Sequence, residues 1–410
     1  MLEKFMGRSF QKYDSPNPSI RFEPREPIVT SPEPDSELNA VRVALVHDWL
    51  TGMRGGEKVL EVLCQLYPHA ELFTLVHKPN SVSAVIERHQ PHTSIIQSLP
   101  NAHKFYRYYL PLFPFAIERF DLNGFDLILS TSHCVAKAVI KTGHTRHLCY
   151  CHSPMRYAWD QYDAYFGPER IGALQSQLLR PFFRALARWD AKTSDRVDRF
   201  VANSQHVAAR IHRYYNRQAQ VIHPPVDVEF FRQDNTVPGK HFLVVSALVP
   251  YKRIDVAIEA CQSIGAQLKI VGQGPELNRL RNMSGDTVEF LGTCSAEVLR
   301  QHYREALAVL LPGEEDFGIV PVEALACGRP VVALAKGGAL ETITDGVSGV
   351  LVHDNSASAF ADGLLRVSEH SFDSNTIRSK ALIFSTDRFI ERIRKCVRTT
   401  IEAAPENVRC

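Results

Sequence analysis

Residues 41–68 read VRVALVHDWLTGMRGGEKVLEVLCQLYP and decide the fold. The first ten residues, 41–50, form a short β-branched apolar run, which is the pattern of a buried parallel strand. A glycine-bearing turn, TGMRGGEK, follows at 51–58, and the pattern at 59–68 predicts a short helix that ends near Pro68. A strand, a glycine loop and a helix in this order are the first unit of a Rossmann-like α/β domain.

Two rounds of this strand–helix alternation run along the chain. In the first round, further strands are predicted at 71–77, 125–133, 147–154, 199–205 and 219–225. In the second round, strands are predicted at 241–248, 267–274, 287–292, 307–313, 330–338 and 349–352. The polar segment QDNTVPGKH at 233–241 separates the rounds and is typical of a linker. The predicted fold class is therefore α/β, with two Rossmann-like domains facing across a cleft.

The same patterns divide the chain into segments. Residues 1–39 are rich in Pro, Ser and Glu and show no periodicity, which is typical of a disordered or loosely docked tail. We expect an N-terminal domain over 40–232 and a C-terminal domain over 241–380. A last helical segment is predicted at 381–404.

Length and composition exclude several classes of protein. A chain of 410 residues suggests about two to three domains. Its 47 Lys and Arg balance 45 Asp and Glu, and this net charge of +2 argues against a dedicated nucleic-acid binder. No run of about 18 apolar residues occurs, and the start MLEKFMGRSF lacks an apolar signal region, so we expect a cytoplasmic protein. The nine cysteines are then expected to be reduced thiols, mostly buried.

The most informative polar residues lie in GEEDFGIVPVEALACGRPVVALAKGG at 313–338. Phe317 and Gly318 fall in a predicted loop, and a helix begins at Ile319, where the N–H groups and the dipole favour a phosphate. Glu315 and Glu323 stand on either side of that helix start, and two such carboxylates suit the hydroxyls of a sugar and a ribose. Acidic residues near helix starts also occur simply as partners of the dipole.

Other candidate residues follow predicted strands. Lys252 and Arg253, in the sequence PYKR at 250–253, form either a diphosphate site or a solvated basic loop. Gly272 follows another strand of the same predicted sheet, where a glycine lets a ligand approach the backbone.

In the first round, Gly56 lies in the glycine loop, and His152 ends a strand on the same side. The alternatives for these two residues are a tight turn and a structural histidine.

Several catalytic motifs are absent from the sequence. It contains no G-x-x-x-x-G-K-[ST] loop, no G-x-S-x-G elbow and no H-E-x-x-H pair, which excludes the corresponding ATPases, hydrolases and metalloproteases. It also has no D-x-D pair, and Cys149 and Cys151 have no second cysteine pair nearby, so we predict no metal site.

Together these pieces resemble a retaining glycosyltransferase of family 4 with the GT-B fold, over about residues 41–400. The strongest likeness is EDFGIVPVEA at 315–324, followed by GRPVVA at 328–333 and the Gly-Gly-x-x-Glu pattern at 337–341. The segment FSTDRFIERI at 384–393 is similar to the closing helix of that family, which crosses back to the N-terminal domain. The resemblance therefore implies that 381–404 packs towards the N-terminal domain, which would be the acceptor domain, while the C-terminal domain would bind the nucleotide-sugar donor.

A narrower likeness concerns three other motifs. HDWLTGMRGGEK at 47–58, CHSPMRYAWD at 151–160 and LVPYKRID at 248–255 resemble a subgroup of bacterial mannosyltransferase-like enzymes that build O-antigen or exopolysaccharide units. This likeness favours GDP-mannose as the donor, with UDP-glucose or another UDP-hexose as the alternative.

The resemblance also implies roles for individual residues, three of them catalytic: His152, Lys252 and Glu315. Glu315 would contact hydroxyls of the donor sugar, Lys252 would bind the diphosphate, and His152 would lie beside the donor sugar. Glu323 would bind the ribose hydroxyls. The remaining donor-site residues would be Gly56, Arg253, Gly272, Phe317, Gly318, Ile319 and Val320, the stretch 317–319 offering backbone N–H groups.

One position departs from the family pattern. Many members have Gly-Arg where this chain has Ser246-Ala247, and that arginine grips the diphosphate. A charge-assisted contact worth about 1.5–3 kcal/mol would be missing, and we expect Arg253 to compensate for it. In the implied mechanism the acceptor hydroxyl attacks on the face that the diphosphate leaves, and no divalent metal or other cofactor is required.

The acceptor side is less determined. A saccharide or a lipid-linked acceptor is expected, and no nucleic acid. The aromatic and basic stretches 102–120 and 178–189 would suit peripheral contact with the inner face of a membrane, or else form ordinary core-facing amphipathic helices. Three other functions stay open: a GT-B disaccharide synthase, a non-catalytic nucleotide-sugar-binding protein, and, third in order, a dehydrogenase, for which the G-x-G-x-x-G fingerprint is missing.

Overall fold

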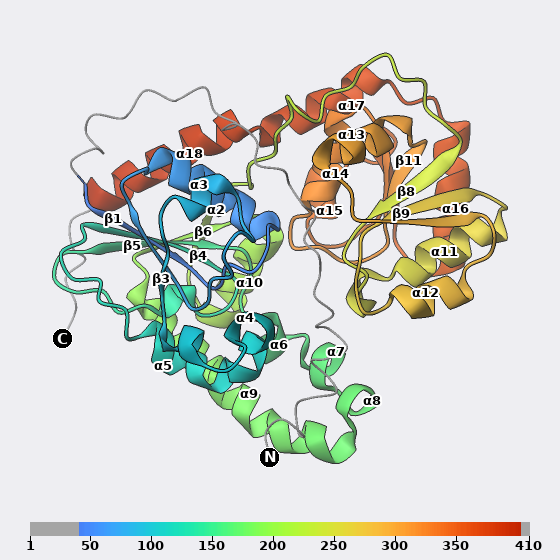
Figure 1. Cartoon of the computed structure of the whole chain (residues 1–410). Coiled ribbons are helices and arrows are strands. Elements are labelled where there is room, and N and C mark those ends of the chain that lie inside the picture. The colour runs from blue at the N-terminus through green and yellow to red at the C-terminus, as the bar shows by residue number, and fades with distance from the viewer. Residues whose placement is uncertain (1–40, 403–410) are drawn as a thin grey trace. The chain divides into compact units, whose positions relative to one another are not determined.

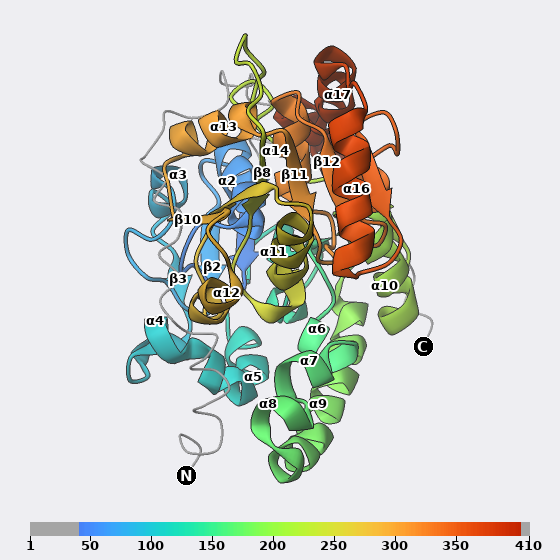
Figure 2. The same cartoon turned by 90° about the vertical axis from the view of Figure 1, so that its right-hand side faces the viewer.

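The computed structural model describes residues 41–402, and this range divides into two compact units. Unit 1 comprises residues 41–223 and 389–402, and unit 2 comprises residues 224–388. Each unit contains one parallel sheet with helices against both faces, as Figures 1 and 2 show. The predicted tail at 1–39 lies outside the described residues.

Unit 1 is built on a seven-stranded sheet with the order β3-β2-β1-β4-β5-β6-β7. All its strand pairs are parallel. The strands are β1 (Val43–His47), β2 (Glu71–Thr74), β3 (His92–Thr93), β4 (Leu127–Ser132), β5 (Arg146–Cys151), β6 (Arg199–Ala202) and β7 (Ala219–Val221). The five further strands predicted for this half are thus confirmed, and the two-residue β3 is an addition.

The helices of unit 1 vary widely in length. They are α2 (Gly55–Leu66), α3 (Ala84–Glu87), α4 (Ala102–Phe105), α5 (Phe113–Ile117), α6 (Arg156–Trp159), α7 (Tyr162–Phe166), α8 (Pro168–Ile171), α9 (Ala173–Thr193), α10 (Gln205–Tyr215) and α18 (Thr386–Glu402), which enters unit 1 at residue 389. Short 3₁₀ turns stand between them, η1 (Ile95–Ser98), η2 (Tyr106–Leu112), η3 (Ala136–Ala138) and η4 (Ser194–Arg196).

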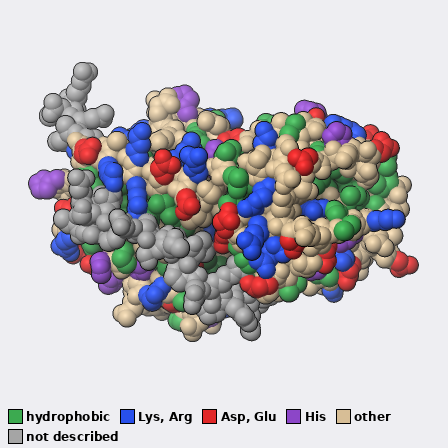
Figure 3. All heavy atoms as spheres, turned by 90° about the horizontal axis from the view of Figure 1, so that it is seen from above, with side chains coloured by type: hydrophobic (Ala, Val, Ile, Leu, Met, Phe, Trp, Pro, Cys, Tyr) green, Lys and Arg blue, Asp and Glu red, His purple; other side chains and the backbone are tan. Residues whose placement is uncertain are grey.

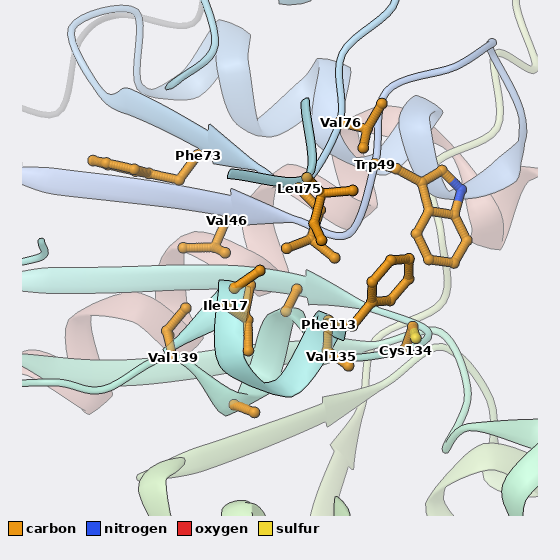
Figure 4. Packing of buried hydrophobic residues seen from close by; sticks show 14 of the residues in the cluster. Val46, Trp49, Phe73, Leu75, Val76, Phe113, Ile117, Cys134, Val135 and Val139 are labelled. Carbon is orange, nitrogen blue, oxygen red and sulfur yellow. The ribbon is translucent and has the colours of Figure 1, made fainter. Parts of the chain in front are cut away.

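Alternation of side chains along the central strands creates two cores in unit 1. Ala44 and Val46 of β1 point into a cluster with residues of η2, α5 and α9, part of which Figure 4 shows. Val43 and Leu45 point to the opposite face, into a cluster with residues of α2 and α18. Because both faces of the strand are covered by helices, its sequence is a continuous apolar run.

Unit 2 repeats this plan with a six-stranded parallel sheet of order β10-β9-β8-β11-β12-β13. Its strands are β8 (His241–Val245), β9 (Gln267–Val271), β10 (Val288–Gly292), β11 (Ala308–Leu311), β12 (Val331–Leu334) and β13 (Gly349–Val352). Its helices are α11 (Ile254–Ser263), α12 (Leu277–Met283), α13 (Ala296–Glu305), α14 (Ile319–Ala326), α15 (Ala339–Thr342), α16 (Ala357–Glu369) and α17 (Ser374–Ala381), with the 3₁₀ turns η5 (Pro250–Lys252) and η6 (Leu382–Phe384). All six strands predicted for this half are confirmed.

The boundary between the units falls before the polar segment that the sequence suggested. Residues 224–232 belong to unit 2, because Val226, Val228 and Phe231 are buried in one of its cores. The N–H of Val226 also donates to the carbonyl of Phe384 over 3.0 Å. The segment 233–241 is therefore a surface loop of unit 2 that leads into β8 rather than the linker itself.

Candidate functional site

The two charged residues singled out at the carboxyl edge of the unit 2 sheet lie in contact. Lys252 ends η5 after β8, and Glu315 follows β11, the neighbouring strand. Lys252 Nζ donates a hydrogen bond to Glu315 Oε1 and forms an ion pair with it. The two side chains are 16% and 20% exposed, so this pair is shielded from solvent more than an ordinary surface pair.

Glycines let the loops that carry these residues pack backbone against backbone. A Cβ on Gly313 would lie 2.8 Å from the Cα of Lys252. Gly337 has φ +60°, and a Cβ there would lie 2.2 Å from the carbonyl oxygen of Glu315. The N–H of Gly338 donates to the same oxygen over 2.8 Å. Larger side chains at these positions would displace the loops, so the glycines fix where Lys252 and Glu315 stand.

Helix α14 begins beside this pair. Gly318 precedes it with φ +83°, and a Cβ there would lie 3.5 Å from the Cβ of Glu315. Phe317 is 3% exposed, and its ring lies edge-on to Phe384 with centroids 5.4 Å apart, so only its backbone is placed to serve the site. Ile319 and Val320 form the first turn, where backbone N–H groups have no partner within the helix and attract anions.

Glu323 lies one turn further along α14 and is buried. Its Oε2 accepts a hydrogen bond of 2.8 Å from the hydroxyl of Tyr303, which belongs to α13. Burial raises the pKa of Tyr303 well above its usual range, and the Glu323 carboxylate raises it further, so the phenol keeps its proton and donates. Nothing in the sequence signals this partner, since it depends on how α13 packs on α14.

Gly272 and Arg253 have different surroundings from those of the Lys252–Glu315 pair. Gly272 has φ +143°, and a Cβ there would lie 1.8 Å from the carbonyl oxygen of Ser246, so the loop after β9 packs directly on the loop after β8. Arg253 adopts a left-handed conformation with φ +50° and caps α11. Its Nε lies 3.3 Å from Asp255 Oδ1, so Asp255 shares the guanidinium charge.

In unit 1, Gly56 and His152 lie next to each other at the carboxyl edge of the sheet. Gly56 is in the first turn of α2, and a Cβ there would lie 3.4 Å from His152 Nε2 and 3.6 Å from His47 Cε1. Asn203 fixes the backbone of His152 by donating from Nδ2 to its carbonyl over 3.0 Å. Burial lowers the pKa of His152 to about 3, helped by the nearby His133 and His47, so its imidazole is neutral near pH 7.

Other features of the described chain bear on the sequence-based expectations. Within residues 41–402, no cluster of three or more His, Cys, Asp and Glu side chains could hold a metal ion. No helix in the same range combines the length and the apolar character needed to cross a membrane. Seven of the eight described cysteines are buried, and Cys294 is half-buried. On the face drawn in Figure 3, basic and acidic side chains are interspersed.

Comparison with known proteins supplies two family matches. Residues 55–230 match the model described as Glycosyltransferase Family 4, and residues 227–382 match that of Glycosyl transferases group 1. The D-inositol 3-phosphate glycosyltransferase of Geodermatophilus obscurus is 29% identical over 52% of this chain and 55% of its own. That of Mycobacterium marinum is 34% identical over 42% of this chain and 43% of its own. The chain thus spans about half the length of the curated relatives it matches.

Solved structures resemble the chain over most of its length. Sucrose-phosphate synthase from Thermosynechococcus elongatus covers 88% of this chain with a TM-score of 0.65 and 18% identity, all of that chain being matched. The Anabaena protein HepE in complex with UDP-glucose covers 87% with a TM-score of 0.62 and 19% identity, 99% of that chain being matched. These likenesses show the GT-B fold. The two family matches together span residues 55–382 and support a glycosyltransferase of the family 4 type.

Proposed function

We propose that this protein is a retaining glycosyltransferase that moves a hexose, with mannose favoured, from a nucleotide diphosphate sugar to a saccharide or lipid-linked acceptor in polysaccharide biosynthesis. The observation that carries the proposal is the Lys252–Glu315 pair. It brings a cation suited to a diphosphate and a carboxylate suited to sugar hydroxyls to one point, next to the start of α14.

The chemistry needs negative charge to be stabilised as the diphosphate leaves the anomeric carbon. Lys252 would supply a positive charge, and the N–H groups at 317–319 would supply dipoles that are already oriented. Glu315 would hold sugar hydroxyls, and Glu323, oriented by Tyr303, would hold the ribose. Arg253 would add positive charge only in part, because Asp255 shares its guanidinium.

The family resemblance would also give donor-binding roles to His152 and Gly56 of unit 1. His152 stays neutral, so its ring would accept or donate a hydrogen bond to the donor sugar without repelling a positive charge that develops at the anomeric carbon. Gly56 leaves the first turn of α2 without a side chain beside His152, so the diphosphate would approach the N–H groups of that turn.

The relatives bear on the choice of donor. One solved neighbour was captured with UDP-glucose and with UDP, which supports a UDP-hexose as the alternative to GDP-mannose. The curated relatives are named for transfer to D-inositol 3-phosphate, which makes a phosphorylated polyol a further acceptor to test. No divalent metal or cofactor is part of the proposed mechanism.

The first experiment is thermal unfolding with GDP, UDP, ADP or NAD, each without and with magnesium. A ligand that binds the folded state raises the unfolding temperature by mass action. We expect one nucleoside diphosphate to raise it without magnesium, and a Lys252→Met variant to lose most of the shift. A shift with NAD alone would contradict the proposal and favour a dehydrogenase.

Release of the nucleotide from GDP-mannose or UDP-glucose then separates the remaining alternatives. A protein that binds the nucleotide but never releases it from a sugar donor would be a non-catalytic binder. Release that depends on a free sugar or sugar phosphate as acceptor would favour a disaccharide synthase.

We also propose a cytoplasmic location, with peripheral membrane contact through unit 1. The 102–120 stretch is broken into α4, η2 and α5, and much of its apolar surface faces the core, yet Leu112 and Phe115 are 42% and 49% exposed. Leu174 and Leu178 of α9 are also exposed, and Arg119 stacks on Phe115 at 4.1 Å. Flotation with anionic liposomes tests this contact, and a protein that stays in the aqueous fractions would contradict it.

A further inference from the structure

Asp48 organises the carboxyl edge of the unit 1 sheet. It directly follows β1, and its side chain is fully buried. Its two carboxylate oxygens accept four backbone N–H groups from the segment after β4, over 2.6–2.9 Å, those of His133, Cys134, Val135 and Ala136. Hydrogen bonds to a charged acceptor are stronger than neutral ones, so one carboxylate fixes this whole turn.

The other end of the same turn is held by a second buried charge. Lys137 is 1% exposed, and its Nζ lies 3.0 Å from Asp190 Oδ1 of α9. It also donates to the Asp190 carbonyl over 2.6 Å and to Thr193 Oγ1 over 3.1 Å. The turn 133–137 is therefore clamped from both sides before any ligand arrives.

The clamp sets the position of the His133 ring. His133 Nδ1 lies 3.2 Å from Asp48 Oδ2, and since a carboxylate only accepts, this contact favours a neutral ring that carries its proton on Nδ1. Trp49 meets the ring edge-on with centroids 4.5 Å apart and fixes its plane. Figure 4 shows Trp49 beyond the end of β1 and Cys134 and Val135 beyond the end of β4, with Phe113 between them.

Nε2 of His133 is then left as a hydrogen-bond acceptor. The side chain is 33% exposed, and within the described residues no hydrogen bond to Nε2 occurs. Burial lowers the pKa of the ring, and the nearby Asp48 carboxylate opposes this only in part. The lone pair on Nε2 is thus available near pH 7.

We infer that His133 Nε2 accepts a hydrogen bond from a hydroxyl of the acceptor substrate, and that Asp48 is the positioning residue that orients it. This inference rests on the proposed function. His133 follows β4 and His152 follows β5, the adjacent strand, and their ring centroids are 6.4 Å apart. If His152 serves the donor sugar, the neighbouring ring is placed for the group that attacks it, because reacting atoms approach to about 3–3.5 Å.

Three variants of His133 separate this role from a structural one. His133→Gln keeps a polar acceptor near the position of Nε2, His133→Asn keeps one only near Nδ1, and His133→Ala keeps neither. His144→Ala is the matched control, because His144 is exposed and precedes β5, at the opposite edge of the same sheet.

The assay measures release of nucleoside diphosphate from GDP-mannose and from UDP-glucose. The acceptors are water alone, free mannose, free glucose and D-inositol 3-phosphate. We expect the acceptor KM to rise about tenfold or more in the Asn and Ala variants and by less than about threefold in the Gln variant. In the control His144→Ala, the acceptor KM, the donor KM and the slow hydrolysis by water should all change by less than about twofold. An unchanged acceptor KM in the Asn and Ala variants would overturn the role of Nε2.

The pairing with Asp48 has a spectroscopic test that needs no substrate. In protein labelled with ¹⁵N-histidine, comparison with His133→Gln identifies the His133 signals among the 17 histidines. We expect a neutral ring with its proton on Nδ1 in the wild type and loss of that preference in Asp48→Asn. A proton on Nε2 in the wild type would overturn the pairing even if the Asp48 variant fails to fold. If the wild type releases nucleotide from neither sugar donor, both the proposed function and the acceptor role of His133 are wrong. The spectrum would still test the contact between His133 and Asp48.

Discussion

Replacing Lys252 by Met is the sharpest test of the donor site. Met keeps most of the length of the lysine side chain and removes only the charge and its hydrogen bonds. Without a bound donor, the substitution leaves the Glu315 carboxylate without the ammonium group of Lys252, at a site where both side chains are mostly shielded from solvent. We expect the free energy of unfolding to fall by about 1 kcal/mol, near the upper end for exposed ion pairs.

The effect on turnover should be larger than the effect on stability. A hydrogen bond to a charged group contributes about 1.5–3 kcal/mol, which corresponds to a factor of about 10 to 150 in rate. The diphosphate carries more negative charge in the transition state than in the bound donor, so the loss should appear mainly in kcat. Lys252 would therefore have a modest role in folding and a strong one in catalysis.

The measurement is nucleotide release at saturating donor, together with urea unfolding of the same samples. Lys240→Ala is the matched control, because Lys240 is exposed and directly precedes β8, at the amino edge of the same sheet. A second variant that combines Lys252→Met with Glu315→Gln should recover stability but not turnover. Turnover of Lys252→Met within about twofold of the wild type would refute the assigned role, since the smallest effect expected from such a contact is about tenfold.

Three further predictions concern other parts of the chain. Gly56→Ala should leave the unfolding temperature unchanged or raise it, because Ala favours a helix by about 0.5–1 kcal/mol over Gly. It should lower turnover, because the new Cβ would lie 3.4 Å from His152 Nε2 and crowd the donor. Turnover equal to that of the wild type would contradict the role of Gly56. Tyr303→Phe should lower the free energy of unfolding in urea by about 1–3 kcal/mol, because it removes the buried hydroxyl that donates a hydrogen bond to Glu323. It should also raise the KM for the sugar donor. An unchanged KM would contradict the proposal that Glu323 binds the ribose. Burial lowers the pKa of His147 from 6.5 to about 3, so the unfolded chain binds the extra proton, and the free energy of unfolding should fall by up to about 1.4 kcal/mol per pH unit as the pH drops below 6.5. His147→Gln should flatten that slope in urea titrations, and an unchanged slope would assign the effect to other groups.

Most strands could be predicted from the sequence for a physical reason. A parallel strand covered on both faces favours apolar side chains at every position, and β11 and β12 are continuous runs of this kind. The two-residue β3 was missed because both its side chains are exposed and carry no apolar signal. In 102–120, Pro111 and Pro114 interrupt the helical pattern, which explains why short pieces replace one helix.

The site was only partly readable. Lys252 and Glu315 were each found because charged residues follow predicted strands, but their pairing depends on β8 and β11 being neighbours, an order that local patterns do not reveal. Tyr303 lies on the buried face of an amphipathic helix and looks like any core aromatic. Asp48 was passed over for a similar reason, since its partners are backbone groups more than 80 residues away.

The path of α18 has a consequence for synthesis of the protein. Phe389, Ile390 and Ile393 of this helix complete a core of unit 1 that begins with Val43, while the described part of unit 2 is the single stretch 224–388 between them. During synthesis, residues 224–388 of unit 2 are therefore complete before unit 1 has α18, the helix that covers one face of its sheet. On the ribosome, residues 41–223 would keep apolar surface uncovered until α18 emerges, and chaperones would bind there for longest.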